Sequence, residues 1–225
     1  MDILKDIENS NYFIIFRNGT AIGDHLLITS VIDKIKNYYS REIIVYTMYP
    51  ELFKNNHKIY KIFNYKKSSD TIRKFLRRSN SKYILNFRHN WTYEKEKKSL
   101  PEWHTTIIKE ISFKNCCPEI FLSSQEIEEY KNKFNLPDKY YIIQSQSKRN
   151  KKKNKDWGYG NFQNVVNVTN SQIKWIQIGS KNEKKLKNVH LNLCGKTTLR
   201  ELFYIISKSY IVLSNDGVLS HISAA

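Results

Sequence analysis

Two stretches at opposite ends of this chain share one pattern, and that pattern constrains the fold most. Near the start, the apolar run Tyr12–Phe16 leads into a turn that contains Gly23 and Asp24, and a helical pattern follows. Near the end, Tyr210–Leu213 leads into a turn that contains Asp216. In open α/β sheets, ligands bind beyond the carboxyl ends of the strands. A carboxylate in each turn therefore predicts two α/β units facing one substrate, and hence an enzyme.

Strand-like and helix-like patterns alternate along the chain, which predicts βαβ units and mainly parallel sheets. One series ends near residue 122 and a second starts after Pro137, so we predict two domains, residues 1–122 and 138–225. Residues 90–101 are expected to form a loop. The expected strands are 12–16, 43–46, 59–63, 83–87, 140–144, 173–178, 191–193 and 210–213, and the expected helices are about 26–38, 71–78, 102–111, 123–134, 161–168 and 199–207.

The chain stops where more structure is expected. Residues 220–225 are typical of the first turns of a helix, and nothing follows them. A parallel sheet buried on both faces would normally continue with another strand. We therefore expect the second domain to be incomplete and the chain to be C-terminally truncated.

Charge and cysteine content indicate the class of partner and the cellular compartment. The 225 residues carry a net charge of +17, spread over both halves, which favours anionic partners such as sugar nucleotides, nucleic acid or anionic lipid headgroups. Cys116, Cys117 and Cys194 have neither metal-ligand spacing nor an even count, which fits a reduced compartment. The start lacks the pattern of a signal peptide, and no apolar run has the length of a membrane span. These features predict a cytoplasmic protein.

Several common site types do not match the sequence. The six histidines never pair with cysteine or acidic residues at metal-ligand spacing, so no metal is expected. Neither G-x-x-x-x-G-K-[ST] nor G-x-G-x-x-G occurs. This argues against a P-loop NTPase and against a dinucleotide-dependent oxidoreductase, and no cofactor is expected.

Four motifs in order resemble those of glycosyltransferase family 9, the relatives of ADP-heptose:lipopolysaccharide heptosyltransferases. The motifs are Gly23-Asp24, Lys155-Asp156-Trp157, the segment 195–199 and the segment 215–221. The resemblance implies a GT-B fold, in which two Rossmann-like domains face a cleft. It also implies an acceptor-side first domain, a donor-nucleotide-binding second domain, and inverting, metal-independent sugar transfer. A nucleotide sugar such as ADP-heptose would be the donor, and a lipopolysaccharide core or another saccharide the acceptor.

Asp24 has two interpretations. Its position at the start of a helix is typical of a residue that caps the helix. By the resemblance, Asp24 is instead the general base that deprotonates the acceptor hydroxyl. Thr29 departs from a proline that the family often has nearby.

The run from Lys148 to Lys155 has six basic residues in eight and three interpretations. It is a solvated loop, an electrostatic site for nucleic acid, or part of a donor site. The resemblance favours the third, with Lys155 on the donor diphosphate, where it offsets the charge of the leaving group.

A strand followed by Gly179 and Glu183 is the third candidate. Carboxylates after such strands commonly accept hydrogen bonds from ribose hydroxyls, and the resemblance implies this role for Glu183. A surface glutamate is the alternative.

The segment from Asp216 to His221 resembles the family most. Backbone N–H groups of Gly217, Val218 and Leu219 at a helix start would bind phosphate, and Asp216 would hold the donor sugar. The family usually has Ser or Thr and then Gly at positions 217 and 218. The bulky Val218 is therefore expected to hinder close approach of the backbone to phosphate. His221 is either a donor ligand or a packing residue.

We therefore predict a glycosyltransferase, with peripheral contact to an anionic membrane as one expectation. The main alternative is a basic α/β protein that binds nucleic acid without catalysis, although RRM, KH and helix-turn-helix signatures are missing. A degenerate, inactive family member is the third possibility.

Overall fold

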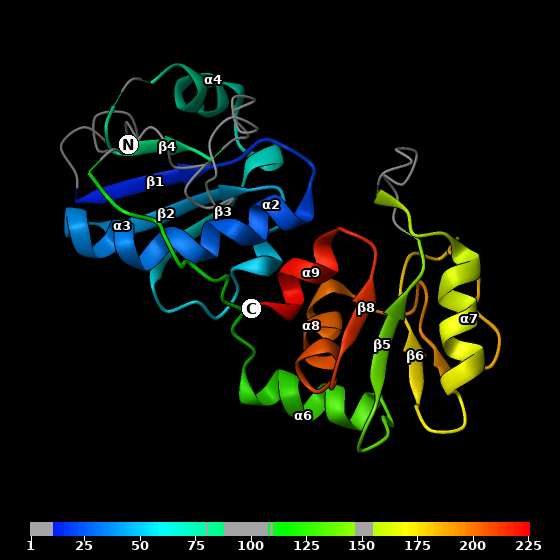
Figure 1. The fold of residues 1–225 in the computed structure, drawn as a ribbon. Coiled ribbons are helices and arrows are strands. Elements are labelled where there is room, and N and C mark those ends of the chain that lie inside the picture. Colours follow the sequence, from blue (N-terminus) through cyan, green and yellow to red (C-terminus); the bar gives the residue numbers. More distant parts are fainter. Residues whose placement is uncertain (1–10, 80, 88–107, 109, 147–154) are drawn as a thin grey trace. The chain divides into compact units, whose positions relative to one another are not determined.

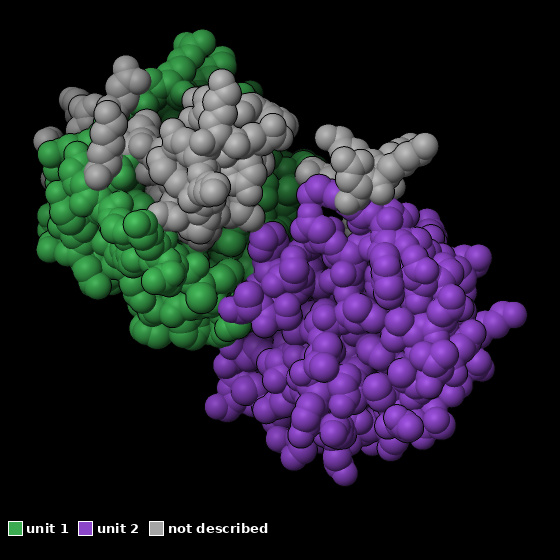
Figure 2. Space-filling model, viewed as in Figure 1, with its two compact units in different colours: residues 1–121, 225 green, residues 122–224 purple. Residues whose placement is uncertain are grey.

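The computed structural model describes residues 11–79, 81–87, 108, 110–146 and 155–225. The chain divides into two compact units, residues 1–121 with 225 and residues 122–224 (Figure 2). Each unit has its own four-stranded sheet, and all strand pairs are parallel. The predicted α/β fold with two parallel sheets is confirmed.

The sheet of unit 1 has the strand order β3-β2-β1-β4. Its central strands β1 and β2 are almost fully apolar, because helices cover both faces of the sheet. Short 3-10 helices, η2 and η3, lie before and after β3. The bounds are β1 (Tyr12–Phe16), β2 (Glu42–Thr47), η2 (Pro50–Leu52), β3 (Ile59–Asn64), η3 (Tyr65–Lys67) and β4 (Ile84–Asn86).

Side chains alternate between the two faces of this sheet. On one face, Leu76 of α4 (Asp70–Arg78) packs with Phe16 and Tyr46. On the other, Tyr39 of α3 (Ile32–Tyr39) contacts Phe13, with 4.9 Å between ring centroids. Helices α3 and α4 thus sandwich the sheet (Figure 1).

The helix expected over about 26–38 consists of three segments. They are α2 (Ile22–Leu26), the 3-10 helix η1 (Leu27–Val31) and α3. In η1, the hydroxyls of Thr29 and Ser30 donate to the carbonyls of Leu26 and Leu27, at 2.7 and 2.6 Å. Such local side-chain bonds compete with regular α-helical geometry, which accounts for the tighter turn here.

Unit 2 repeats the topology of unit 1, with the strand order β7-β6-β5-β8. Counted from the first strand of each unit, both orders are 3-2-1-4. The central strand β5 pairs with β6 on one side and β8 on the other. The bounds are β5 (Tyr141–Gln144), β6 (Trp175–Gln177), β7 (Leu191–Asn192) and β8 (Val212–Ser214).

Helices cover both faces of this second sheet as well (Figure 1). Phe162 and Val166 of α7 (Tyr159–Thr169) pack with Ile143 and Trp175 on one face. The Tyr140 hydroxyl donates to the Ile205 carbonyl at 2.6 Å, which joins the start of β5 to the helix on the other face. The remaining helices are α6 (Ser124–Lys133), α8 (Leu199–Ser207) and α9 (Val218–Ser223).

Helix α6 belongs to unit 2, although the sequence left it between the two predicted domains. A capping box of Ser123 and Glu126, whose spacing in the sequence is typical of this motif, is present at its start. The Glu126 carboxylate also forms a buried ion pair with Arg200 of α8 at 2.7 Å. This pair fastens α6 to α8.

Some predictions lie outside the described residues. These are the loop over 90–101, nearly all of the helix over 102–111 and the basic residues 148–154. Glu110 and Ile111 are described and form a turn and a bend, so the helix predicted there is wrong at its end. Among the described helices, none combines the length and the apolar character that a membrane crossing requires.

Candidate functional site

Each sheet has a point at which the chain connections reverse direction, and ligands favour that point. With the order 3-2-1-4, it lies between β1 and β4 in unit 1 and between β5 and β8 in unit 2. A side chain joins the two strand ends in each case. Arg17 Nη1 donates to the Phe87 carbonyl at 2.6 Å, and Asn215 Nδ2 donates to the Ser145 carbonyl at 3.0 Å.

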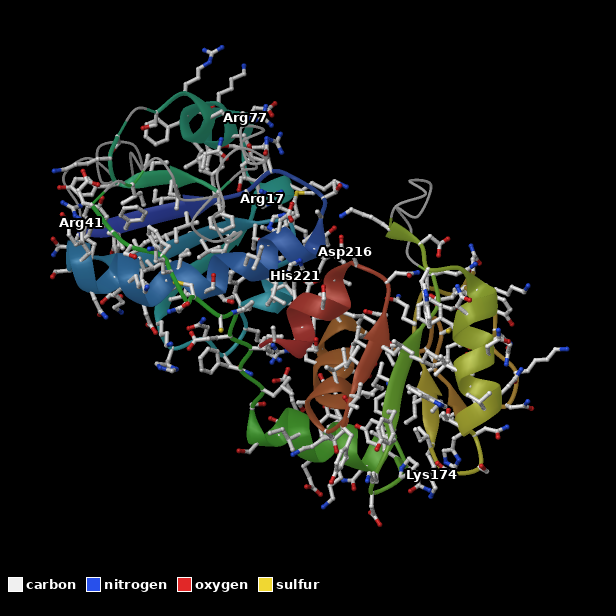
Figure 3. The ribbon with its side chains drawn as sticks, in the orientation of Figure 1. Arg17, Arg41, Arg77, Lys174, Asp216 and His221 are labelled. Carbon is white, nitrogen blue, oxygen red and sulfur yellow. The ribbon has the colours of Figure 1, made fainter. Side chains whose placement is uncertain are left out.

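Asp24 lies at the reversal point of unit 1, in the first turn of α2. The N-cap is Ala21, and no side chain caps this helix, so the alternative interpretation of Asp24 as the cap is wrong. Its carboxylate forms an ion pair with the guanidinium of Arg17 (labelled in Figure 3). The Arg17 side chain is 8% exposed and the Asp24 side chain 25% exposed, so the carboxylate stays within reach of a ligand.

The turn before Asp24 is held by His25, which sequence reasoning missed. His25 Nε2 bonds the Gly19 carbonyl at 2.7 Å, and Nδ1 bonds Thr47 Oγ1 at 2.8 Å. His25 is fully buried, and this burial lowers its pKa from 6.5 to about 4. At neutral pH the ring is therefore uncharged, with both nitrogens in use. Only its place beside Gly23-Asp24 could have drawn attention to it.

A basic pocket of about 330 Å³ lies at the carboxyl ends of β1, β2 and β3 and was also missed. Its wall carries four cationic side chains and one carboxylate. The Arg77 guanidinium donates to the Tyr65 hydroxyl at 2.9 Å, which orients one cation (Figure 3). The pocket thus suits an anionic group. The lining residues are Asn18, Met48, Tyr65, Lys66, Asp70, Arg73, Lys74 and Arg77.

In unit 2 the structure brings together two predicted donor motifs that lie about sixty positions apart in the sequence. Lys155 forms an ion pair with Asp216, and the two side chains are 55% and 57% exposed. Asn215, which is buried, also accepts a hydrogen bond from the Trp157 backbone at 3.0 Å. Asn215 therefore organises the site, whereas the sequence pointed to its neighbour Asp216.

Gly179 and Glu183 lie at the end of β6, next to this site. The Glu183 carboxylate accepts hydrogen bonds from the backbone N–H groups of Ser145 and Gln146, both at 3.0 Å. Burial raises its pKa, and those hydrogen bonds oppose the shift. Gly179 has φ +152°, and a Cβ there would lie 1.9 Å from a Glu183 oxygen, so only glycine fits. The carboxylate orders the segment after β5, while its role towards ribose remains a prediction.

The other predicted donor ligands surround the start of α9. Gly217 is extended with φ 172°, and a Cβ there would meet only the Asn215 carbonyl, at 3.9 Å. Leu219 is buried, and Val218 and His221 are half-buried (His221 is labelled in Figure 3). Helix α9 has six residues. Phosphate binding by this segment stays a prediction, as do both interpretations of His221.

A sequence model described as "Glycosyltransferase family 9 (heptosyltransferase)" matches residues 72–225. Among curated proteins, none matches significantly.

Solved structures match at low sequence identity. A glycosyl transferase family 9 protein from Veillonella parvula has a TM-score of 0.69 and 13% identity, with 93% of this chain and 76% of that chain covered. E. coli ADP-heptose lps heptosyltransferase II has a TM-score of 0.67 and 14% identity, with 94% of this chain and 81% of that chain covered. E. coli heptosyltransferase WaaC with ADP has a TM-score of 0.59 and 10% identity, with 94% of this chain and 84% of that chain covered. These likenesses show the GT-B-type fold.

Proposed function

The chain belongs to glycosyltransferase family 9 and is a glycosyltransferase, and from this premise we propose that it transfers a sugar such as heptose from a nucleotide diphosphate to a saccharide acceptor. The assignment of a donor-binding site to unit 2 rests on one observation. Lys155, Asn215 and Asp216 lie together at the reversal point of unit 2. Two similar solved structures support ADP as the nucleotide of the donor, since one contains ADP and the other ADP-D-beta-D-heptose. ADP-heptose is therefore the first donor to test.

Asp24 is the proposed general base. It accepts the proton of the acceptor hydroxyl while the hydroxyl oxygen forms a bond to the anomeric carbon of the donor. The bond from that carbon to the diphosphate oxygen breaks, and the nucleotide diphosphate leaves with the electron pair. A single displacement of this kind inverts the anomeric configuration. Asp24 suits the role because its carboxylate is partly exposed at a strand end.

Lys155 and Asp216 are the proposed donor ligands. An exposed ion pair contributes little stability, so a ligand can replace it at small cost. Lys155 would turn to the diphosphate and offset the charge that develops as it leaves, without a metal ion. Asp216 would then be available to hydroxyls of the donor sugar.

The basic pocket of unit 1 is the proposed site for an anionic group of the acceptor. Lys66, Arg73, Lys74 and Arg77 surround a space large enough for a phosphorylated or carboxylated sugar. A lipopolysaccharide core is an acceptor of this chemistry. We also propose a cytoplasmic reaction, in keeping with three free cysteines, and peripheral contact with an anionic membrane when the acceptor is lipid-linked.

Calorimetry tests the donor assignment. ADP, UDP, GDP and CDP, each free and as a sugar conjugate, are titrated into the full chain, with duplex DNA as the comparison. We expect one nucleotide diphosphate to bind, and Lys155→Ala to weaken it. Lys174→Ala is the matched control, because Lys174 is exposed and precedes the amino end of β6, whereas the site lies at the carboxyl ends of the strands (Figure 3). Salt-sensitive DNA binding without nucleotide binding would contradict the proposal.

Enzyme kinetics test the acceptor pocket. Lys74→Ala should raise the KM for an anionic acceptor and leave the KM for the donor unchanged. Arg78→Ala is the control, because Arg78 lies on the same helix but outside the pocket lining. Equal effects of the two substitutions would show a general influence of charge instead of a pocket.

A further inference from the structure

A chain of hydrogen bonds fixes the state of the His25 ring. The Gly19 carbonyl can only accept, so His25 Nε2 must carry the hydrogen. Nδ1 is then an acceptor, and the Thr47 hydroxyl donates to it at 2.8 Å. Thr47 Oγ1 in turn accepts from the Tyr49 backbone N–H at 3.1 Å. In this neutral tautomer each of the three hydrogens, on His25 Nε2, the Thr47 hydroxyl and the Tyr49 backbone nitrogen, has an acceptor.

The same strand end holds the turn at a second point. The Tyr49 hydroxyl donates to the Thr20 carbonyl at 2.7 Å. The Tyr49 ring also packs edge-on against the His25 ring, with 5.1 Å between centroids. The Gly19 carbonyl is therefore linked through His25 to Thr47, the last residue of β2, and the Thr20 carbonyl is bonded by Tyr49, which follows that strand.

The position of the turn decides where Asp24 lies. A Cβ on Gly19 would be 3.3 Å from Arg17 Nη2, so the turn runs close beside the guanidinium that pairs with Asp24. Arg17 is itself anchored to the Phe87 carbonyl beyond β4. A shift of the turn away from β2 would change the geometry of this ion pair and move the carboxylate.

We propose that His25 is a positioning residue, which together with Thr47 fixes the turn over residues 19–21 and thereby the Asp24 carboxylate. The inference rests on the proposed role of Asp24 as general base. His25 is not the base itself, because its ring is fully buried and both nitrogens are bonded within the protein. It acts through Asp24, and its own proton stays in place.

Thr47→Val is the decisive variant, because it keeps the shape of the side chain and removes the hydroxyl. We expect faster hydrogen exchange of the amides of residues 18–24. Turnover should fall roughly ten- to a hundredfold, because a displacement near 1 Å is enough for such a loss. The KM for the donor should not change, since its proposed ligands lie in unit 2. Thr47→Ser restores the hydroxyl and should restore both readouts.

Thr29→Val is the matched control for a lost buried hydroxyl. Thr29 Oγ1 donates to the Leu26 carbonyl and accepts from the Glu119 N–H at 2.8 Å, away from the turn. This variant should lose stability without faster exchange over 18–24 and without a change in kcat. Unchanged exchange of the turn in Thr47→Val would overturn the inference, and so would equal losses of kcat in both variants.

Asp24→Asn, assayed in parallel, separates the two claims. If its turnover is normal, the proposed role of Asp24 fails, whatever the exchange data show. If its turnover is lost while Thr47→Val retains full kcat, the role of Asp24 stands and the inference about His25 fails. Exchange is measured on the full chain without substrate, so the structural half of the inference is decided independently of catalysis.

Discussion

The two units have the same strand order, yet they hold the side chains that we propose to be functional differently. In unit 1, Asp24 pairs with an arginine that is 8% exposed, and the turn before it is fastened by a fully buried histidine. In unit 2, Lys155 and Asp216 form an ion pair in which both partners are more than half exposed. One sheet thus presents a carboxylate in a fixed place, and the other presents charges that can change partners.

The two arrangements suit different chemical tasks. A general base has to remain within hydrogen-bond reach of one proton, so a rigid setting helps it. A ligand for a diphosphate has to exchange its own partner for the substrate, so a weak surface pair is sufficient. Even in unit 2 the support is buried, because Asn215 and Glu183 fix the backbone beneath the exposed pair. The contrast therefore lies in the side chains, not in the scaffold.

The strongest test of the rigid side is Asp24→Asn. It removes the proposed base, so turnover should fall about a hundred- to ten-thousandfold. The affinity for the donor should stay near that of the wild type in calorimetry. Stability should also fall, by roughly 1 to 3 kcal/mol, because a buried guanidinium loses its charged acceptor. Chemical denaturation measures this loss.

Asp33→Asn is the control for that experiment. Asp33 also forms an ion pair in unit 1, with Lys58 at 2.5 Å, but its side chain is 52% exposed. We expect normal turnover and nearly normal stability. If Asp24→Asn were as mild as this control, the carboxylate would be neither the base nor rigidly held, and the contrast between the units would disappear.

A second test uses pH on the buried histidine. Its pKa is about 4 in the folded protein and 6.5 as an ordinary value, because burial disfavours the charged ring. The unfolded chain therefore binds more protons between these pH values. The contribution of neutral His25 to the free energy of unfolding is fully present above about pH 6.5. It is lost as the pH falls towards 4, by roughly 3 kcal/mol in all.

Native-state hydrogen exchange of the β1 and β2 amides measures this loss in unit 1. The charged groups next to the ring are Arg17, which lowers the pKa of His25, and Asp24, which raises it; Tyr49 packs against the ring. His25→Phe removes the titrating group, so the difference between wild type and variant isolates its share. Identical pH slopes in the two proteins would show that the ring is not held neutral.

The sequence predicted the fold well, because the fold depends on local patterns. The apolar runs of β1 and β5, the capping box at Ser123 and the restart of the alternation after Pro137 all reflect periodicity and turn chemistry. The helix around Thr29 was less predictable. There, hydroxyl groups bond carbonyls three residues back, and hydrophobic spacing does not reveal such a competition.

The site was predictable only where a motif carries it. Lys155 and Asp216 belong to motifs, and the structure brings them together. His25 and Thr47 lie 22 positions apart, and only the parallel pairing of β1 with β2 brings them into contact. The basic pocket likewise combines three strand ends with α4. Contacts that depend on strand order in this way leave no local signal in a single sequence.

A third test addresses the buried support in unit 2. Asn215→Ala removes hydrogen bonds to the Ser145 carbonyl and the Trp157 N–H, so unit 2 should lose about 2 kcal/mol of stability. Affinity for the nucleotide should fall roughly tenfold, since Lys155 is no longer placed beside Asp216. Asn132→Ala is the control, because Asn132 lies on the exposed face of α6 and bonds Glu128 at the surface. A variant with normal nucleotide affinity would show that the donor motifs do not need this scaffold.

The smallest effect is expected from Asp216→Asn, and it tests the exchangeable side of the comparison directly. An exposed ion pair contributes about 0 to 1 kcal/mol, so the free energy of unfolding should change by less than that. Lys155 loses its competing partner, so a free nucleotide diphosphate should bind equally well or a few-fold more tightly. A nucleotide sugar should bind more weakly, because the proposed sugar ligand is lost. Calorimetry with the two ligands side by side measures this opposite response. A higher affinity for the nucleotide diphosphate together with a lower affinity for the nucleotide sugar requires two things. The ion pair has to open for the donor, and Asp216 has to contact the sugar. If stability instead fell by as much as in Asp24→Asn, the pair would be a fixed structural element, and the two units would hold their charges in the same way.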